Sequence, residues 1–155
     1  IDPRLDEVQR LQHGAVELGL GGAPDVLHAV YTRPGRRGRR VAHSGDSLGG
    51  LDWATLARER QTLALYMGVA GLGTIRDQLV QHGRASSTPV AIVENGSRSN
   101  QRVVLATLAE LEDAGRAAAV KSPALVIVGE VAALAERLHW FGSAPVHWHA
   151  LRAVA

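Results

Sequence analysis

Two stretches of this 155-residue chain combine residue types that could bind a ligand, and each directly follows a short apolar run. In the first, Tyr66-Met67-Gly68, the flexible thioether of Met67 could pack against a flat apolar ligand or fill a gap in a core. In the second, Glu94-Asn95-Gly96, a glycine could let a ligand approach the backbone closely or supply the positive φ of a tight turn. Residue types alone favour the structural interpretation of both Met67 and Gly96.

Two other groups resemble known sites only in part. Gly19, Gly21 and Gly22 lack the spacing of a dinucleotide-binding loop, because the third glycine is adjacent to the second. His147 and His149 would share one face of a strand and could bind a metal together. No third ligand is marked beside them, so we expect no metal site and a solvated tail there.

The composition excludes several classes of protein. Hydrophobic residues make up 46% of the chain and charged residues 21%, which is typical of a globular domain. There is no cysteine, which excludes a disulfide scaffold, a cysteine nucleophile and a cysteine-based metal centre. The apolar runs are far shorter than the ~20 residues of a membrane-spanning helix, so we expect a cytoplasmic protein with no membrane partner.

Basic charge is concentrated in one short segment. Five arginines fall within residues 33–40, whereas Lys121 is the only lysine of the chain. Guanidinium groups bind carboxylates and phosphates in a bidentate manner, so the segment suits a polycarboxylate, a nucleic acid or only solvent. Aromatic residues that would stack on bases are not interleaved with these arginines, so we expect no nucleic-acid partner.

Hydrophobic periodicity predicts strands that alternate with helices. We expect a helix over residues 25–31 and an extended stretch from residue 41. The helices expected after that cover residues 53–60, 72–82, 108–118 and 131–141, and the strands cover residues 62–66, 90–93, 102–107 and 125–128. Because some of these strands are apolar at every residue, the prediction is an α/β domain whose mixed, mostly parallel sheet has flanking helices. Ligands of such folds lie in loops beyond the strand ends, here after Tyr66 and Val93.

Six stretches of the chain form an ordered set of motifs. They are Leu51-Asp52-Trp53, Gln61-Thr62-Leu63 up to Tyr66-Met67-Gly68, Thr88-Pro89-Val90 up to Glu94-Asn95-Gly96-Ser97, Gln101-Arg102-Val103, Ser122-Pro123-Ala124-Leu125 up to Val131, and Leu138-His139-Trp140-Phe141. Taken in this order, they resemble the C-terminal half of the uroporphyrinogen-III C-methyltransferases, which are tetrapyrrole methylases also found within siroheme synthase. The resemblance covers about residues 41–141.

The resemblance implies an enzyme that uses S-adenosyl-L-methionine, with S-adenosyl-L-homocysteine as product. Such enzymes are usually homodimers of two-domain subunits, and they methylate uroporphyrinogen III to precorrin-2 in the biosynthesis of siroheme, cobalamin and related porphyrins. By position, the cofactor-binding residues carried over are Met67, Gly96 and Ala124.

The amino-terminal motifs of that family have no counterpart in this chain. The loop G-x-G-P-G-D and the motif G-G-D-P are absent, so we assign no catalytic residue and expect an incomplete enzyme. We expect a leader over residues 1–40 that could be a remnant of the amino-terminal domain, a methylase C-terminal domain over residues 41–142, and a tail over residues 143–155. The alternative is a non-catalytic α/β dimerisation or binding module derived from the same family.

Overall fold

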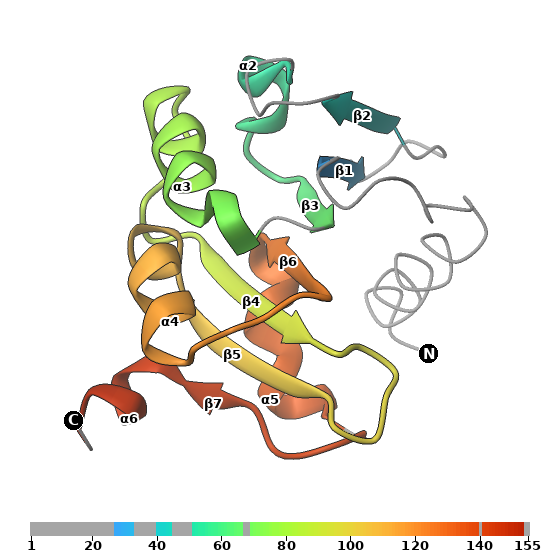
Figure 1. Ribbon diagram of the computed structural model, residues 1–155. Coiled ribbons are helices and arrows are strands. Elements are labelled where there is room, and N and C mark those ends of the chain that lie inside the picture. The colour runs from blue at the N-terminus through green and yellow to red at the C-terminus, as the bar shows by residue number, and fades with distance from the viewer. Residues whose placement is uncertain (1–26, 33–39, 45–50, 67–68, 140, 154–155) are drawn as a thin grey trace.

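The computed structural model describes residues 27–32, 40–44, 51–66, 69–139 and 141–153. These residues form a sheet of seven strands (Figure 1). In spatial order the strands are β2 (Arg40–Ser44), β1 (Leu27–Thr32), β3 (Thr62–Tyr66), β6 (Ala124–Val128), β4 (Pro89–Glu94), β5 (Arg102–Thr107) and β7 (Val146–His147).

Helices lie on both faces of the sheet, so the domain has three layers (Figure 1). One face packs against α2 (Trp53–Leu56), α3 (Leu72–Gln81), α4 (Leu111–Ala117) and α6 (Trp148–Arg152). The short 3-10 helices η2 (Val69–Gly71) and η3 (Leu108–Glu110) lead into α3 and α4. The opposite face is covered by η4 (Glu130–Leu134) and α5 (Ala135–Leu138).

The expected α/β fold is confirmed, but the expectation of a mostly parallel sheet is wrong. Every neighbouring pair of strands is antiparallel except β5 and β7. Strands β3 and β4 do run in the same direction, with α3 as the crossover between them, yet β6 lies between them and runs the opposite way. An apolar strand shows that both of its faces are buried and does not reveal its direction.

Strand β1 corrects the helix expected over residues 25–31. Leu27–Thr32 is extended and pairs with β2 on one side and with β3 on the other. A short apolar run is ambiguous between helix and strand, and here pairing with two neighbouring strands decides the outcome. The division of the chain at residue 40 stays a prediction.

The strands and helices expected between residues 62 and 128 are confirmed with small shifts of their ends. Two other helices are shorter than expected. Helix α2 ends at Leu56, and Arg60 adopts a left-handed backbone with φ 57° before β3 begins. The helix expected over residues 131–141 is η4 followed by α5, which ends at Leu138 because His139 is extended.

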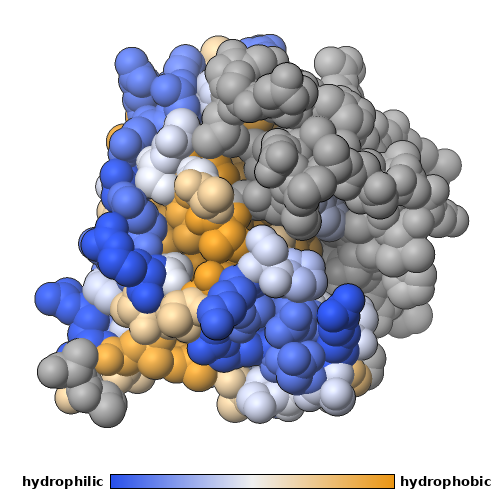
Figure 2. Space-filling model, viewed as in Figure 1, coloured by the Kyte–Doolittle hydropathy of each residue, from blue (hydrophilic) through white to orange (hydrophobic). Residues whose placement is uncertain are grey.

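The core has two parts because strand residues point alternately to the two faces. In β6, Val126 and Val128 face the layer of α2, α3 and α4, whereas Leu125 and Ile127 face η4. All five residues of β6 are buried. Figure 2 shows hydrophilic residues along the margin formed by α3 and α4, with apolar surface in the middle of the view.

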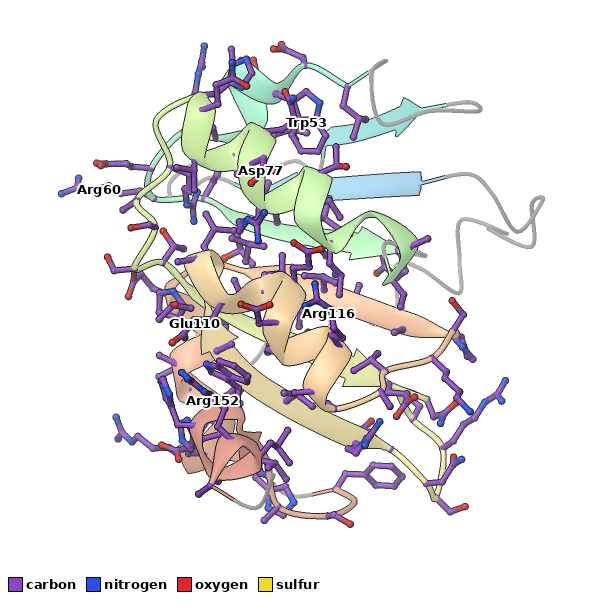
Figure 3. All side chains as sticks on the ribbon, turned by 60° about the vertical axis from the view of Figure 1, so that its left-hand side comes forward. Trp53, Arg60, Asp77, Glu110, Arg116 and Arg152 are labelled. Atoms are coloured by element: carbon purple, nitrogen blue, oxygen red, sulfur yellow. The ribbon has the colours of Figure 1, made fainter. Side chains whose placement is uncertain are left out.

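Helices α3 and α4 approach each other closely at a glycine. A Cβ atom placed on Gly115 would lie only 2.3 Å from Cδ1 of the buried Leu72. Beside this contact, Arg76 of α3 pairs with Glu112 of α4 at 2.8 Å. Asp77 and Arg116 lie on the same two helices (Figure 3).

A buried arginine joins the edge of the sheet at which β3 and β4 begin. Arg84 is 5% exposed and donates to the backbone oxygens of Arg58 at 2.6 Å and Gln61 at 2.9 Å. Burial lowers the pKa of Arg84, although the negative charges of Glu130 and Glu59 act in the opposite direction. The guanidinium therefore ties the loop before β3 to the segment that follows α3.

The segment after residue 142 packs against the domain, so the expectation of a solvated tail is wrong. Trp148 is buried, and the guanidinium of Arg152 lies 5.1 Å from the centre of its ring (Arg152 is labelled in Figure 3). His147 contacts Glu136, and Nε2 of His149 lies 3.3 Å from Oε1 of Glu110. The two histidines thus face different carboxylates instead of forming a shared metal site.

Glu110 connects η3 to this carboxy-terminal segment. Its Oε2 accepts hydrogen bonds from the Thr107 backbone N–H at 3.0 Å and from the Thr107 hydroxyl at 2.8 Å. Burial raises the pKa of Glu110, but these hydrogen bonds and the nearby His149 outweigh burial, so the pKa lies below its ordinary value of 4.5.

The contact between α3 and α4 predicts that Gly115→Val destabilises the protein. The added side chain overlaps Leu72, and we expect the free energy of unfolding in urea to fall by about 1–3 kcal/mol. Ala117→Val creates the same side chain, with two added methyl groups, at an exposed position of the same helix and is the control. Equal losses in the two variants would contradict the close contact.

The lowered pKa of Glu110 predicts a pH-dependent contribution to stability. Ionised Glu110 stabilises the fold above its ordinary pKa, and this contribution disappears as the pH falls through the lowered pKa of the folded state. We expect Glu110→Gln to cost about 1 kcal/mol at pH 7 in urea unfolding, and less at pH 3. Asp113→Asn is the control for the loss of one negative charge. A cost of Glu110→Gln that does not change with pH would contradict this contribution.

Candidate functional site

Three adjacent central strands, β3, β6 and β4, bring two separate loops together at one end of the sheet, where β3 and β4 end and β6 begins. Tyr66, the last residue of β3, is opposite Leu125 near the start of β6. Glu94, the last residue of β4, is opposite Ala124, the first residue of β6. Here this end of the sheet is called the Glu94 edge, and it consists of Tyr66, Glu94, Ala124, Leu125 and the β4–β5 loop, residues 95–101.

The family resemblance predicted Met67, Gly96 and Ala124 as cofactor-binding residues. Gly96 and Ala124 are described by the structure, and both belong to the Glu94 edge. Met67 itself lies outside the described residues, but it directly follows Tyr66 in the chain. Tyr66 is half-buried and packs against the part of the core beneath η4. Gly96 is exposed in the β4–β5 loop.

The conformation of the β4–β5 loop differs from the expectation for Gly96. The positive φ values belong to Asn95, at 53°, and Ser97, at 67°, and Gly96 does not share them. A Cβ atom on Gly96 would lie 3.6 Å from Cγ1 of Val93, which is an ordinary contact. Neither the turn nor the packing of the described residues therefore requires glycine here.

Ala124 lies beneath the surface of the Glu94 edge. It is 7% exposed and belongs to the core on the α3 and α4 side of the sheet. Leu125 and Tyr66 pack on the opposite side, beneath η4. The methyl group of Ala124 thus faces the helical layer, while its two neighbours Leu125 and Tyr66 pack on the other face of the sheet.

Polar contacts hold the β4–β5 loop in place. The Ser97 N–H donates to Oε1 of Gln101 at 2.8 Å, and Nε of Arg102 donates to Oε2 of Glu94 at 2.9 Å. The side chains of Gln101 and Arg102 thus support the two ends of this loop. In addition, the Asn95 N–H donates to the Pro123 carbonyl at 3.0 Å, which joins the loop to the segment before β6.

Glu94 is the residue that sequence reasoning missed. Its carboxylate accepts hydrogen bonds from Arg102 and from the backbone N–H of Lys121. The sequence did indicate the pair with Arg102, because an acidic residue ends an apolar strand and an arginine follows shortly after the next turn. The contact with Lys121 had no signal in the sequence, because it depends on β6 pairing with β4.

The described residues limit the chemistry of the site. Within them, no group of three or more His, Cys, Asp or Glu side chains could hold a metal ion. No helix in the described ranges is long and apolar enough to cross a membrane.

In Figure 2 the hydrophilic surface over the β4–β5 loop lies beside apolar surface in the middle of the view.

Comparison with known proteins identifies the family of the chain. Residues 22–112 match the family described as Tetrapyrrole (Corrin/Porphyrin) Methylases. The chain belongs to this family. Siroheme synthase of Xylella fastidiosa (strain M12) is 58% identical over 106 residues, which are 68% of this chain and 22% of that protein. The chain thus spans about a fifth of the length of this curated relative.

Two solved structures are also similar. A cobalamin biosynthetic enzyme, cobalt precorrin-4 methyltransferase, has a TM-score of 0.50 and 22% identity, covering 53% of this chain and 34% of that one, and so shares the fold. Uroporphyrin-III C-methyl transferase from Thermus thermophilus, complexed with S-adenyl homocysteine, is 35% identical over 56% of this chain and 39% of that chain, with a TM-score of 0.48. The family resemblance seen in the sequence is confirmed.

The geometry of Gly96 predicts that a methyl group is tolerated by the folded chain. We expect Gly96→Ala to change the free energy of unfolding by no more than about 0.5 kcal/mol, because its Cβ makes only an ordinary contact. Gly129→Ala is the contrasting variant, since Gly129 has φ 140° and its Cβ would lie 3.1 Å from the Gln61 carbonyl oxygen. Urea unfolding measures both, and a large loss for Gly96→Ala would show that the fold itself requires this glycine.

Proposed function

We propose that this chain supplies the cofactor-binding half of a methyltransferase that converts uroporphyrinogen III to precorrin-2. S-adenosyl-L-methionine is the methyl donor, and the tetrapyrrole serves siroheme or cobalamin biosynthesis. The observation that carries the proposal is the register of β3, β6 and β4, which brings the end of β3, the start of β6 and the β4–β5 loop to the Glu94 edge. We further propose a cytoplasmic homodimer.

The residues at the Glu94 edge suit such a cofactor. Gly96 leaves its exposed side open, and the fold of the described residues gives no other reason for a glycine there. Ala124 leaves room at the start of β6 because its side chain is small and packs toward the helical layer, and Met67 would add a polarisable apolar contact. When bound, the cofactor supplies the methyl group, while these residues bind and orient the adenosyl part.

The substrate proposal rests on charge. Uroporphyrinogen III is an octacarboxylate, and the arginines within residues 33–40 can bind carboxylates in a bidentate manner. These positions lie outside the described residues, except that Arg40 begins β2. Methyl transfer also requires the donor to be in line with the attacking carbon, and no described residue is assigned to that step.

The alternative is a non-catalytic module of the same family, because the amino-terminal motifs are absent from the sequence. The two proposals differ in their reaction with uroporphyrinogen III and S-adenosyl-L-methionine. Methylated product formed by this chain alone excludes the non-catalytic module. Cofactor binding without product supports a binding half that depends on further chain for catalysis.

Cofactor binding is tested by calorimetric titration with S-adenosyl-L-homocysteine. We expect the wild-type chain to bind, and Gly96→Val to raise the Kd about tenfold or more because its side chain fills the open side of the loop. Met67→Asp should weaken binding as well, since it places a charge where apolar contact is proposed.

Ala85→Val is the matched control, because Ala85 is exposed in the segment before β4, at the opposite edge of the sheet. Binding that is equal in Gly96→Val, Ala85→Val and the wild type would contradict the proposed site. Absence of binding by the wild type at millimolar ligand would contradict the proposed function.

A further inference from the structure

The carboxylate of Glu94 lies where three segments of the Glu94 edge meet. Its Oε2 accepts from Arg102 of β5, with Nε at 2.9 Å and Nη2 at 2.7 Å. Its Oε1 accepts from the backbone N–H of Lys121, at 2.7 Å, in the segment that leads into β6. Glu94 is opposite Arg102 in one strand pairing and opposite Ala124 in the other. One side chain thus connects β4, β5 and the start of β6.

This position suits a carboxylate, because donors approach both of its oxygens. Both oxygens accept hydrogen bonds, and every partner is a donor. A glutamine would offer one accepting oxygen and would turn its NH₂ group toward a second donor, so one of the two contacts would be lost. The side chain of Glu94 is only 12% exposed, while its contact with the Lys121 N–H is open to solvent.

The contacts next to Glu94 show what the carboxylate positions. Asn95, the next residue, donates its N–H to the Pro123 carbonyl, so the β4–β5 loop and the segment before Ala124 are joined twice. Gly96 follows Asn95 directly. A shift of the Lys121–Pro123 segment would therefore move both Gly96 and Ala124.

We propose that Glu94 is a positioning residue for the cofactor, which holds the Gly96 loop at a fixed distance from the start of β6. The inference rests on the proposed function and deepens it, because it identifies what fixes the geometry of that site. The side chain of Lys121 has no part in this role, since Lys121 contributes its backbone N–H.

The test compares Glu94→Gln with Glu112→Gln. The control removes a carboxylate that pairs with Arg76 and Arg116, between α3 and α4, away from the Glu94 edge. We expect Glu94→Gln to raise the Kd for S-adenosyl-L-homocysteine about tenfold, and Glu112→Gln to leave it unchanged. Titrations well below the thermal midpoints of both variants ensure that a general loss of stability cannot account for the difference in binding.

Amide hydrogen exchange supplies a second measurement that needs no ligand. In Glu94→Gln the amides of Lys121 and Asn95 should exchange about tenfold faster, while the amides of β6 keep their protection. Lys121→Ala should leave both exchange and binding as in the wild type. Because Glu94 and Arg102 act as a pair, adding Arg102→Gln to Glu94→Gln should weaken binding by less than the sum of the single effects.

The failures of the two proposals are distinguishable. A wild-type chain that does not bind S-adenosyl-L-homocysteine contradicts the proposed function, and with it a role of Glu94 in cofactor binding. Wild-type binding together with an unchanged Kd in Glu94→Gln overturns the positioning role alone. Unchanged exchange at Lys121 and Asn95 overturns the claim that Glu94 holds the two segments together.

Discussion

The insertion of β6 between β3 and β4 is the constraint on which the rest of the structure depends. This strand is buried on both faces and pairs antiparallel with both neighbours, so it separates two strands that a single crossover would otherwise leave adjacent. Its residues supply both parts of the core, and its first residue lies at the Glu94 edge. The site and the core are therefore fixed by the same strand, and a change that displaces β6 affects both.

The sequence was a good guide to elements and a poor guide to their directions. Residues 62–66 and 102–107 have the apolar and β-branched character of strands, and the structure agrees. Strand direction depends on which partner a strand finds, and that information lies in distant residues such as those of β6. The same limit applies to Leu27–Thr32, whose strand conformation comes from pairing on both sides.

The candidate site was predictable only in part for the same reason. Loops after apolar strands are a sound place to expect ligands, and Gly96 and Ala124 do lie at one edge. The contact between Glu94 and Lys121 joins residues 27 positions apart and depends on the order of the strands. The role of Trp148 escaped notice because a short segment without clear periodicity gives no sign that one large side chain anchors it.

The buried Arg84 makes the two ends of the sheet unequal. Its guanidinium is bound by backbone carbonyl oxygens, which do not titrate, and arginine keeps its proton in proteins. The carboxy-terminal segment, in contrast, is held by the buried side chain of Trp148 and by the short pairing of β7 with β5. The end of the sheet held by Arg84 therefore depends on backbone atoms that any sequence would supply there, whereas the carboxy-terminal segment depends on the identity of one side chain, Trp148.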